Sequence, residues 1–346
     1  MGMQAPFKAQ KRYAGMTSDE TTATQVGFYV RDFVDWFHDS LRGADTVSGK
    51  TWMTAFSELP HAQFRRTIQR GVGGYLRARD TFPNFREAND FTQMTLMNSI
   101  LMPLQKKNPA DKLMTGSYIP TKLRKDVRTA KVMATFDSAE DLTFEGLKPG
   151  SYFLKSNHGS QQNRHIDLRD GADPIDLDAL RKEAAIWLSE PYGQNSSQWW
   201  YQFIDRKLIV EEDLRQDNLD EPLEDLRFHC INGRVALLQL DIGLGTDHRD
   251  NPVYDGDLNY MPYNFLRSNN AEAPLPALAG KARDIAAELC KPHQYVRVDL
   301  YARGEELFLG ELTYLPNSGR RKIRSRKLNE YLCDFWDPMP QVVGVK

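Results

Sequence analysis

The sequence predicts an α+β protein in which a mainly helical segment precedes a region of largely antiparallel strands. From Gln25 to about Leu101, apolar residues recur at spacings of three and four, which is typical of amphipathic helices. From about Ser117 onward, short apolar runs alternate with turn clusters, and only two stretches keep a helical spacing. Strands joined by short turns pair antiparallel, so the second region should contain antiparallel sheets. The polar residues 1–22 should be frayed.

Three helices are expected in the first region. FYVRDFVDWFHDSL contains an apolar stripe, which we interpret as core packing because apolar residues at helical spacing usually face a core. The other two are AQFRRTIQRGVGGYLRAR, which Gly71, Gly73 and Gly74 weaken, and DFTQMTLMNSILMPLQKK. This region offers no group of residues suited to catalysis.

The second region contains six runs that predict strands: KVMATF, SYFLKS, RKLIVEE, RVALLQLDI, QYVRVDLY and ELFLGELTYL. Two helical stretches lie among them, DLDALRKEAAIWLSEPYG and LPALAGKARDIAAELCK. We therefore expect a mainly helical region at residues 23–116 and an α+β region at residues 117–346.

The charge balance argues against a general electrostatic grip on nucleic acid. The 346 residues carry 45 basic and 47 acidic side chains, a formal net charge of −2. RRKIRSRK, at Arg320–Lys327, is the densest basic run, and such a run is usually solvated or salt-bridged. We expect no nucleic-acid partner.

Cysteine usage and hydropathy predict a cytoplasmic location. Cys230, Cys290 and Cys333 form no C-x-x-C pair, which excludes a familiar zinc spacing and a disulfide framework and fits a reducing compartment. The first residues have no apolar segment typical of a signal peptide. No run approaches the roughly 20 apolar residues of a membrane span, so stable membrane insertion is not expected.

A lysine ends one predicted strand and opens a polar loop, Lys155-Ser-Asn-His-Gly-Ser160. Backbone N–H groups of a Gly- and Ser-rich loop can close on a phosphate, with a lysine as counter-charge. The alternative is a strand that ends in a solvated turn, since Asn, Gly and Ser are common turn residues.

Two further segments bring charged residues to strands. LIVEEDL runs into Glu211 and Glu212, which form either a solvated edge or a hinge that binds adenine and ribose. In EDLRFHCINGR, Asp225 and Arg227 share one strand face ahead of an Asn-Gly turn, which is a hairpin signal.

The most informative pattern lies on the last two predicted strands. Arg297 and Asp299 share one face of the first, and Glu311 and Thr313 share one face of the second. If these strands pair, Asp299 and Glu311 come close and repel each other unless a cation lies between them. Mg²⁺ suits hard oxygen ligands of this kind. The alternative is a cross-strand ion pair of Arg297 with Asp299 or Glu311.

Taken together, these segments resemble the ATP-grasp superfamily and, within it, the TupA-like branch named for teichuronopeptide biosynthesis. The resemblance runs from about Asp137 to Trp336. Its motifs are the Lys–Asn-His-Gly-Ser loop, WWYQFIDRKLIVEEDL, DLRFHCINGR, RVDLY and GELTYLPNSG. The resemblance implies an ATP-grasp fold, in which two α+β subdomains with antiparallel sheets grip ATP, here at residues 117–210 and 211–346.

The resemblance also implies ATP and Mg²⁺ as cofactors and assigns site residues. Arg297, Lys155 and Arg227 would be catalytic, with Arg297 facing the acyl phosphate. The remaining assignments are ATP binding by Lys155, His158, Gly159, Ser160, Glu211, Glu212 and Arg227; metal binding by Asp299, Glu311 and Thr313; and substrate binding by Asp225, Asn317, Ser318 and Gly319.

The chain departs from the family pattern in three ways. Gln161 and Gln162 follow Ser160 where the family loop often continues with glycine. Thr313 stands where many members of the superfamily carry asparagine, so water would complete the metal site. The first phosphate-binding lysine stays open among Lys122, Lys125 and Lys131.

The implied activity is ATP-dependent ligation of a small-molecule carboxylate to an amine through an acyl phosphate. The substrates would be an amino acid or amine and a sugar acid or other carboxylate, in polysaccharide or secondary-metabolite biosynthesis. HRDNPVYDGDLNYMPYNFL, at His248–Leu266, either lines a sugar-sized pocket or forms a surface loop. The alternative is a non-catalytic carbohydrate- or nucleotide-binding partner of a glycosyltransferase, in which the consecutive Trp199, Trp200 and Tyr201 stack on sugars. On a strand these three would face both ways, which puts at least one in the core. The oligomeric state stays undetermined.

Overall fold

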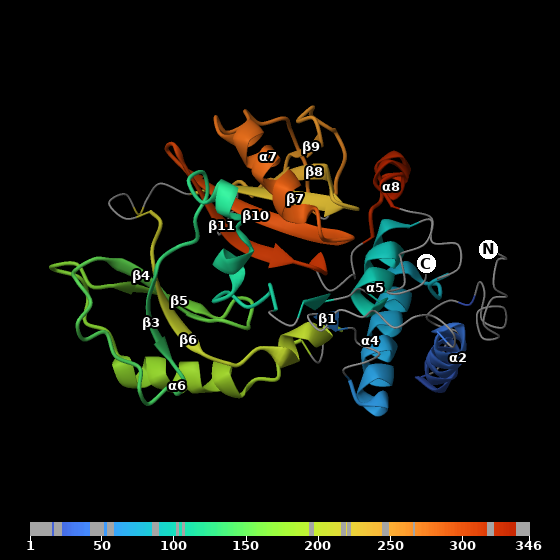
Figure 1. Ribbon diagram of the computed structural model, residues 1–346, viewed down its shortest axis with the longest axis horizontal. Coiled ribbons are helices and arrows are strands. Elements are labelled where there is room, and N and C mark those ends of the chain that lie inside the picture. The colour runs from blue at the N-terminus through green and yellow to red at the C-terminus, as the bar shows by residue number, and fades with distance from the viewer. Residues whose placement is uncertain are drawn as a thin grey trace.

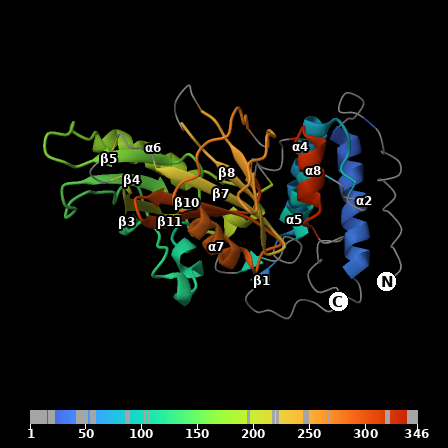
Figure 2. The same cartoon turned by 90° about the horizontal axis from the view of Figure 1, so that it is seen from above.

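In the part of the chain that it describes, the computed structural model contains two larger antiparallel sheets, one two-stranded antiparallel pair and a group of helices (Figure 1). The structure describes residues 16, 23–41, 52–53, 59–84, 90–101, 104–105, 108–193, 197–215, 219, 223–243, 249–265, 267–316 and 322–336. Figures 1 and 2 both show the small sheet at one end of the molecule, the large sheet next to it and a group of helices at the other end. The predicted α+β class with antiparallel sheets is confirmed.

The small sheet has four antiparallel strands in the order β3-β6-β4-β5. They are β3 (Val132–Phe136), β4 (Ser151–Ser156), β5 (Asn163–Asp167) and β6 (Leu208–Glu212). Helix α6 (Leu177–Ser189) packs against this sheet through Leu180, Ala184 and Trp187, whose spacing of four and three places them on one face. Asp176 begins the helix, because its side chain accepts a hydrogen bond from the Ala179 backbone N–H at 2.9 Å.

The large sheet has five antiparallel strands in the order β11-β10-β7-β8-β9. They are β7 (Glu224–Ile231), β8 (Arg234–Leu240), β9 (Val253–Asp255), β10 (Tyr295–Arg303) and β11 (Glu306–Thr313). Asn232 and Gly233 join β7 to β8 with φ of 49° and 69°, so the predicted Asn-Gly hairpin is present. Residues 304–305 join β10 to β11, and Gly304 has φ of 56°.

The two faces of the large sheet differ in chemistry. Leu226, Phe228, Val298, Leu300 and Leu312 belong to a buried apolar cluster that includes residues of helix α7 (Ala279–Cys290). Charged residues occupy the alternate positions of the same strands, because successive side chains point to opposite faces. The packing of α7 on one face therefore leaves the other face for the charged residues.

Four helices form the opposite end of the molecule. They are α2 (Ala23–Leu41), α4 (His61–Arg79), α5 (Phe91–Leu101) and α8 (Arg326–Cys333), and the order of contact is α2 with α4, α4 with α5, and α5 with α8 (Figure 2). Helix α4 continues through its three glycines. A Cβ on Gly71 would lie 2.7 Å from Leu96 Cδ1, so this glycine permits the close approach of α4 to α5.

Helix α8 has no counterpart among the predicted elements. Ser325 begins it by accepting a hydrogen bond from the Leu328 backbone N–H at 3.2 Å, and Leu328 and Leu332 are buried. Arg326, from the basic run, is exposed and pairs with Glu330 at 2.7 Å. The described part of the basic run therefore leads into helix α8, whose apolar side packs in a buried cluster.

Trp199, Trp200 and Tyr201 also differ from the strand considered for them. They lie in a 3₁₀ helix, η3 (Trp199–Phe203), and all three side chains are buried. Three residues per turn allow aromatic side chains to pack on several sides of one short turn. The other short elements are β1 (Trp52–Met53), which pairs with β2 (Leu104–Gln105), and the 3₁₀ helices η1 (Thr115–Tyr118) and η2 (Thr121–Leu123).

None of the helices within the described residues combines the length and the hydropathy needed to cross a membrane.

Candidate active site

The polar face of β10 and β11 brings two carboxylates and an arginine together. The strands pair in a register that sets Asp299 opposite Glu311 and Arg297 opposite Thr313, as expected for a pair of neighbouring strands. Arg297 Nε donates to Asp299 Oδ1 at 2.6 Å, and Arg297 Nη2 lies 2.5 Å from Asp299 Oδ2 and 3.8 Å from Glu311 Oε2. The cation between the two carboxylates in this structure is therefore a guanidinium.

Burial and charge act against each other at this pair. Burial raises the pKa of Asp299 to about 6, although the Arg297 charge and its hydrogen bonds oppose the rise. Burial lowers the pKa of Arg297, but the Asp299 charge outweighs this effect and the pKa of Arg297 is raised. The pair is thus a buried, charge-assisted contact, the kind in which loss of one partner is costly.

A local irregularity helps to orient Glu311. The register of β10 and β11 shifts after Asp299, since Leu300 pairs with Leu309 and Gly310 is the extra residue. A Cβ on Gly310 would lie 2.5 Å from a ring carbon of Tyr301, so only glycine leaves room for that ring. Such bulges often re-aim a side chain next to a functional site.

The donor set fits Mg²⁺. Glu311 is 36% exposed in its side chain, so this carboxylate is accessible to a ligand. Asp299 uses one lone pair of each oxygen for Arg297, and a carboxylate has about four lone-pair sites in all. Thr313 Oγ1 already accepts from Arg297 Nη2 at 3.2 Å, which makes it the weakest of the three predicted ligands. Among the described residues, there is no group of three or more His, Cys, Asp or Glu side chains that could hold an ion by themselves.

The small sheet contributes a second ion pair. Lys155 at the end of β4 pairs with Glu211 on the neighbouring strand β6. The adjacent Glu212 points elsewhere: it accepts from Arg128 Nη1 at 2.5 Å and from the Lys131 backbone N–H at 2.9 Å. The two predicted hinge carboxylates are therefore both paired, and their role toward adenine and ribose stays a prediction.

Arg128 also connects the two sheets. Its guanidinium carbon lies 4.3 Å from the centre of the Phe308 ring on β11, and its backbone forms an isolated parallel bridge with Phe308. Because the same guanidinium binds Glu212 on β6, Arg128 fixes the strand of the predicted hinge against the edge of the large sheet.

The loop after β4 is closed by its own side chains. Ser156 Oγ accepts from the Gly159 backbone N–H at 2.9 Å and donates to Gln162 Oε1 at 2.5 Å. Gln162 Nε2 also donates to Glu190 at 2.7 Å. Gln161, where the family loop often has glycine, has φ of 62°, a left-handed conformation that disfavours side chains other than glycine.

His158 lies inside this loop rather than at its surface. Its ring is 1% exposed, with Nδ1 at 3.2 Å from Asn157 Oδ1 and Nε2 at 3.1 Å from the carbonyl oxygen of Trp187 on α6. Burial lowers the pKa of His158 to about 4, so the ring is neutral at pH 7. In this geometry His158 attaches the loop to α6, and its predicted contact with phosphate would require the ring to leave the core.

Lys112 contacts the loop after β4 and was not among the predicted site residues. Its backbone N–H donates to the Asn157 carbonyl at 3.1 Å, and its Nζ donates to the Gly159 carbonyl at 2.5 Å. Burial lowers the pKa of Lys112, and the charges of Glu311, Lys155 and Glu211 act on it. Lys112 therefore lies where residues of both sheets meet.

The three candidates that the sequence analysis gave for the first phosphate-binding lysine all lie upstream of β3. Lys122 is 63% exposed in its side chain and pairs at 2.5 Å with Glu288 on α7. Lys125 is likewise exposed, and Lys131 contributes its backbone N–H to Glu212. Lys112 belongs to a turn and has no motif around it, so neither periodicity nor spacing could have singled it out.

Arg227 is held by two buried carboxylates. Its Nη2 lies 2.5 Å from Asp225 Oδ2 and its Nη1 lies 2.6 Å from Asp241 Oδ2. Burial raises the pKa of Asp225 against the effect of Arg227. Burial also opposes the charged form of Arg227, but the charges of Asp225 and Asp299 outweigh it and raise the pKa of Arg227. Asp241 also pairs with Arg249, and both Asp241 and Arg249 were absent from the predicted site. Asp225 thus has a protein partner, and its role toward a substrate stays a prediction.

Two tyrosines complete the surroundings of Glu311. Tyr201 of η3 and Tyr192 have ring centres 4.9 Å apart, and burial followed by the Glu311 charge raises the pKa of Tyr201. Tyr192 is hydrogen-bonded to Ser160, so the loop after β4 and the segment before β6 meet near Glu311.

Two other predictions concern the end of the substrate site and the Tyr- and Asn-rich segment. Asn317, Ser318 and Gly319 lie outside the described residues. In the Tyr- and Asn-rich segment His248–Leu266, Tyr254 is buried and its hydroxyl donates to the Ala273 carbonyl, so this tyrosine packs in the core.

Comparison with known proteins identifies one family. The family model described as TupA-like ATPgrasp matches residues 95–336. Among solved structures, the D-alanine–D-alanine ligase of Bacillus anthracis complexed with ATP superposes with a TM-score of 0.41 and 13% identity, over 66% of this chain and 64% of that one. The ATP-grasp ligase PsnB complexed with a minimal precursor gives 0.36 and 13%, over 65% and 59%.

The D-alanine–D-alanine ligase of Helicobacter pylori gives a TM-score of 0.38 and 12% identity, over 67% and 60%. The chain spans less than two thirds of the length of each of these three proteins. A search of curated proteins finds no match.

Proposed function

Because the chain belongs to the TupA-like ATP-grasp family, we propose that it is an ATP-dependent ligase that joins a carboxylate to an amine through an acyl phosphate. One observation carries the proposal. Lys112 lies within the electrostatic reach of Glu211 and Glu311, which belong to different sheets, and Lys155 pairs with Glu211. Lysines between two sheets, facing acidic side chains, form the charge arrangement that a magnesium-bound triphosphate requires.

The proposed reaction has two steps. A carboxylate oxygen of one substrate attacks the γ-phosphorus of ATP, the bond from that phosphorus to the bridging oxygen breaks, and ADP leaves. The amine nitrogen then attacks the acyl carbon, phosphate leaves and the nitrogen loses a proton. Neither step needs a nucleophilic side chain, and phosphoryl transfer depends mainly on positioning and charge compensation.

The residues of this chain supply that compensation. Lys112 and Lys155 would neutralise phosphate oxygens, and Lys112 already orients the Gly159 carbonyl of the loop. Glu311 and Asp299 would hold Mg²⁺, which supplies further positive charge to the phosphate oxygens. Arg297, which lies between those carboxylates, would stabilise the negative charge that forms on the acyl oxygen in the second step.

The ion pairs of the structure define the state from which nucleotide would bind. Lys155 pairs with Glu211, so this carboxylate orients the Lys155 side chain. A phosphate group that displaces Glu211 from Lys155 would free this carboxylate for ribose hydroxyls. The proposed roles of Lys155 and Glu211 are thus linked, and loss of Glu211 should also weaken the orientation of Lys155.

The proposed substrates are an amino acid or amine and a sugar acid or other small carboxylate, in polysaccharide or secondary-metabolite biosynthesis. The family description supports only the ATP-grasp part, and the substrates rest on the name of the branch. A panel of uronic acids, amino acids and amines incubated with Mg-ATP, with ADP release as the readout, tests this.

Glu311→Gln is the decisive variant. It removes the charge that would bind Mg²⁺ and keeps the side-chain volume, so ADP release should fall by about 10²-fold or more while the fold is retained. The matched control is Glu305→Gln, because Glu305 is exposed in the turn before β11. Wild-type turnover by Glu311→Gln would contradict the proposal.

A non-catalytic binding partner of a glycosyltransferase is the second candidate. Its best support was a row of aromatic side chains for sugar stacking, but Trp199, Trp200 and Tyr201 are at most 5% exposed. Buried rings offer no stacking surface, so the ligase is the better supported of the two functions. Calorimetry that finds Mg-dependent ATP binding with no turnover on any substrate would favour the binding partner.

A further inference from the structure

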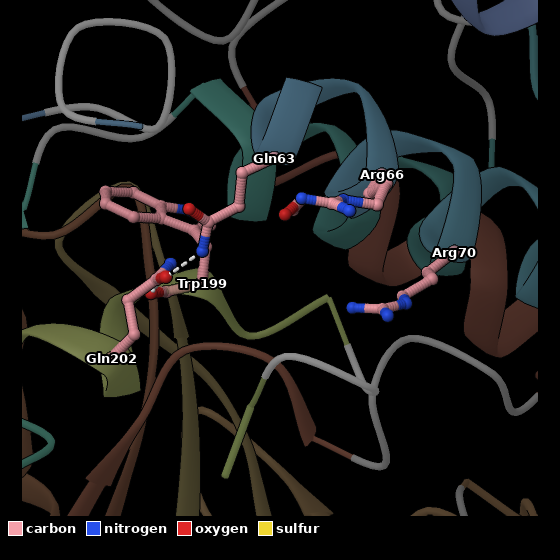
Figure 3. Close-up of a pocket in the computed structure, with 6 residues that line it drawn as sticks. Gln63, Arg66, Arg70, Trp199 and Gln202 are labelled. Atoms are coloured by element: carbon pink, nitrogen blue, oxygen red, sulfur yellow. Dashed lines mark hydrogen bonds between the residues drawn. The ribbon is translucent and has the colours of Figure 1, made fainter. Parts of the chain in front are cut away.

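A second cavity lies outside the ATP-grasp site, between helix α4 and the 3₁₀ helix η3 (Figure 3). Its volume is about 290 Å³. The residues that line it are Gln63, Arg66, Thr67, Arg70, Trp199 and Gln202. The proposed ligation reaction makes no use of this cavity.

The wall formed by η3 is rigid. Trp199 is 1% exposed, and its Nε1 donates to the Ser99 carbonyl at 2.6 Å. Gln202 Nε2 donates to the Trp199 carbonyl at 2.7 Å, and Gln63 of α4 donates to Gln202 across the cavity edge. These bonds hold the two elements together, so the cavity exists before any ligand arrives.

The wall formed by α4 is positively charged. Arg66 and Arg70 are four residues apart, which places them one above the other on the helix surface. Figure 3 shows both guanidinium groups extending from α4 toward the space above η3. Residues 61–79 contain five arginines and no aspartate or glutamate, and among the described residues that line the cavity none is acidic.

We propose that this cavity binds the oxyanion group of a small molecule, either a phosphate or a carboxylate. Two guanidinium groups one helical turn apart can donate several parallel N–H bonds to one such group, and arginine suits bidentate contact of this kind. The amide groups of Gln63 and Gln202 would form hydrogen bonds with hydroxyl groups on the same molecule, the NH2 group as donor and the oxygen as acceptor. This site does not depend on the proposed ligase activity.

Direct binding to the full chain tests the site, with isothermal titration in a buffer free of other oxyanions. The probes are inorganic phosphate, glucose 6-phosphate and D-glucuronate, so that the two sources of the oxyanion are distinguished. We expect the wild-type chain to bind at least one probe, and Arg66→Gln/Arg70→Gln to bind it at least tenfold more weakly. Arg65→Gln is the matched control, because Arg65 is an exposed neighbour on α4 that does not line the cavity.

A second variant keeps the test informative if the double substitution affects folding. Gln202→Glu retains the size of the wall and adds one negative charge, which should also weaken binding at least tenfold. Binding of phosphate at Lys155 instead would persist in all of these variants. The proposal is overturned if no probe binds to the wild-type chain, or if Arg66→Gln/Arg70→Gln and Gln202→Glu bind as the wild type does.

Discussion

Replacement of Lys112 by methionine should separate activity from stability. Lys112 Nζ donates to the Gly159 carbonyl at 2.5 Å, and a hydrogen bond from a charged group contributes about 1.5–3 kcal/mol. Burial lowers the pKa of Lys112, which means that its charge is held at a cost in the folded state. Methionine removes both the bond and that cost, so the free energy of unfolding should change by less than about 1 kcal/mol, as for other swaps of similar volume.

Activity should respond very differently. The methionine side chain cannot neutralise a phosphate oxygen, and loss of one preorganised charge of this kind lowers kcat by about 10²–10³-fold. Urea denaturation followed by circular dichroism measures the stability, and coupled detection of ADP measures the activity. Lys122→Met is the control, since Lys122 is exposed and pairs with Glu288 away from the loop. ADP release by Lys112→Met at the wild-type rate would refute the placement of Lys112 in the site.

Three further predictions concern the loop after β4. Burial lowers the pKa of His158 from 6.5 to about 4. Between these two pH values the unfolded chain binds a proton on His158 and the folded chain does not. The contribution of the neutral ring to stability is therefore complete above pH 6.5 and is lost as the pH falls toward 4. The free energy of unfolding should fall by about 2 kcal/mol between pH 7 and pH 5 because of this group. Urea denaturation of His158→Gln should show a correspondingly smaller decrease over the same pH range. An equal decrease in both proteins would argue against the buried neutral ring. A Cβ at Gly159 would lie 1.8 Å from Gln162 Oε1 and 2.6 Å from Ser156 Oγ. Gly159→Ala should therefore lower the free energy of unfolding by about 1–3 kcal/mol and raise KM for ATP. An unchanged unfolding midpoint in urea would count against this packing. Gln161 has φ of 62°, so Gln161→Gly should raise the free energy of unfolding by about 0.5 kcal/mol, the gain from relieved strain less the entropy of glycine; a clear decrease would show that the Gln161 side chain stabilises the loop.

Local pattern alone determined much of this protein. The alternation of Arg297 and Asp299 with apolar neighbours predicted both strand and face, because side chains on a strand point alternately to its two sides. The Asn232-Gly233 turn predicted the hairpin between β7 and β8, because both positions need positive φ. The order of these motifs was enough to indicate the family, which the match over residues 95–336 confirms.

Short elements were harder to predict than strands. Helix α8 has only eight residues and begins in a basic run, and what holds it is the burial of Leu328 and Leu332 by distant parts of the chain. Likewise the conformation of η3 depends on contacts such as that of Trp199 with Ser99, 100 residues earlier. Elements of one or two turns gain little stability from their own hydrogen bonds, so tertiary packing decides their form.

Only the tertiary structure decided which charges meet. Lys112 reaches the Gly159 carbonyl from 47 residues away, and a bond to a backbone oxygen leaves no trace in the residue types of the partner. The sequence left open whether a metal ion or a guanidinium lies between Asp299 and Glu311, and the geometry puts Arg297 there. Strand patterns depend on neighbours in the chain and can be read from it, whereas Coulomb interactions depend on distances that exist only once the chain has folded.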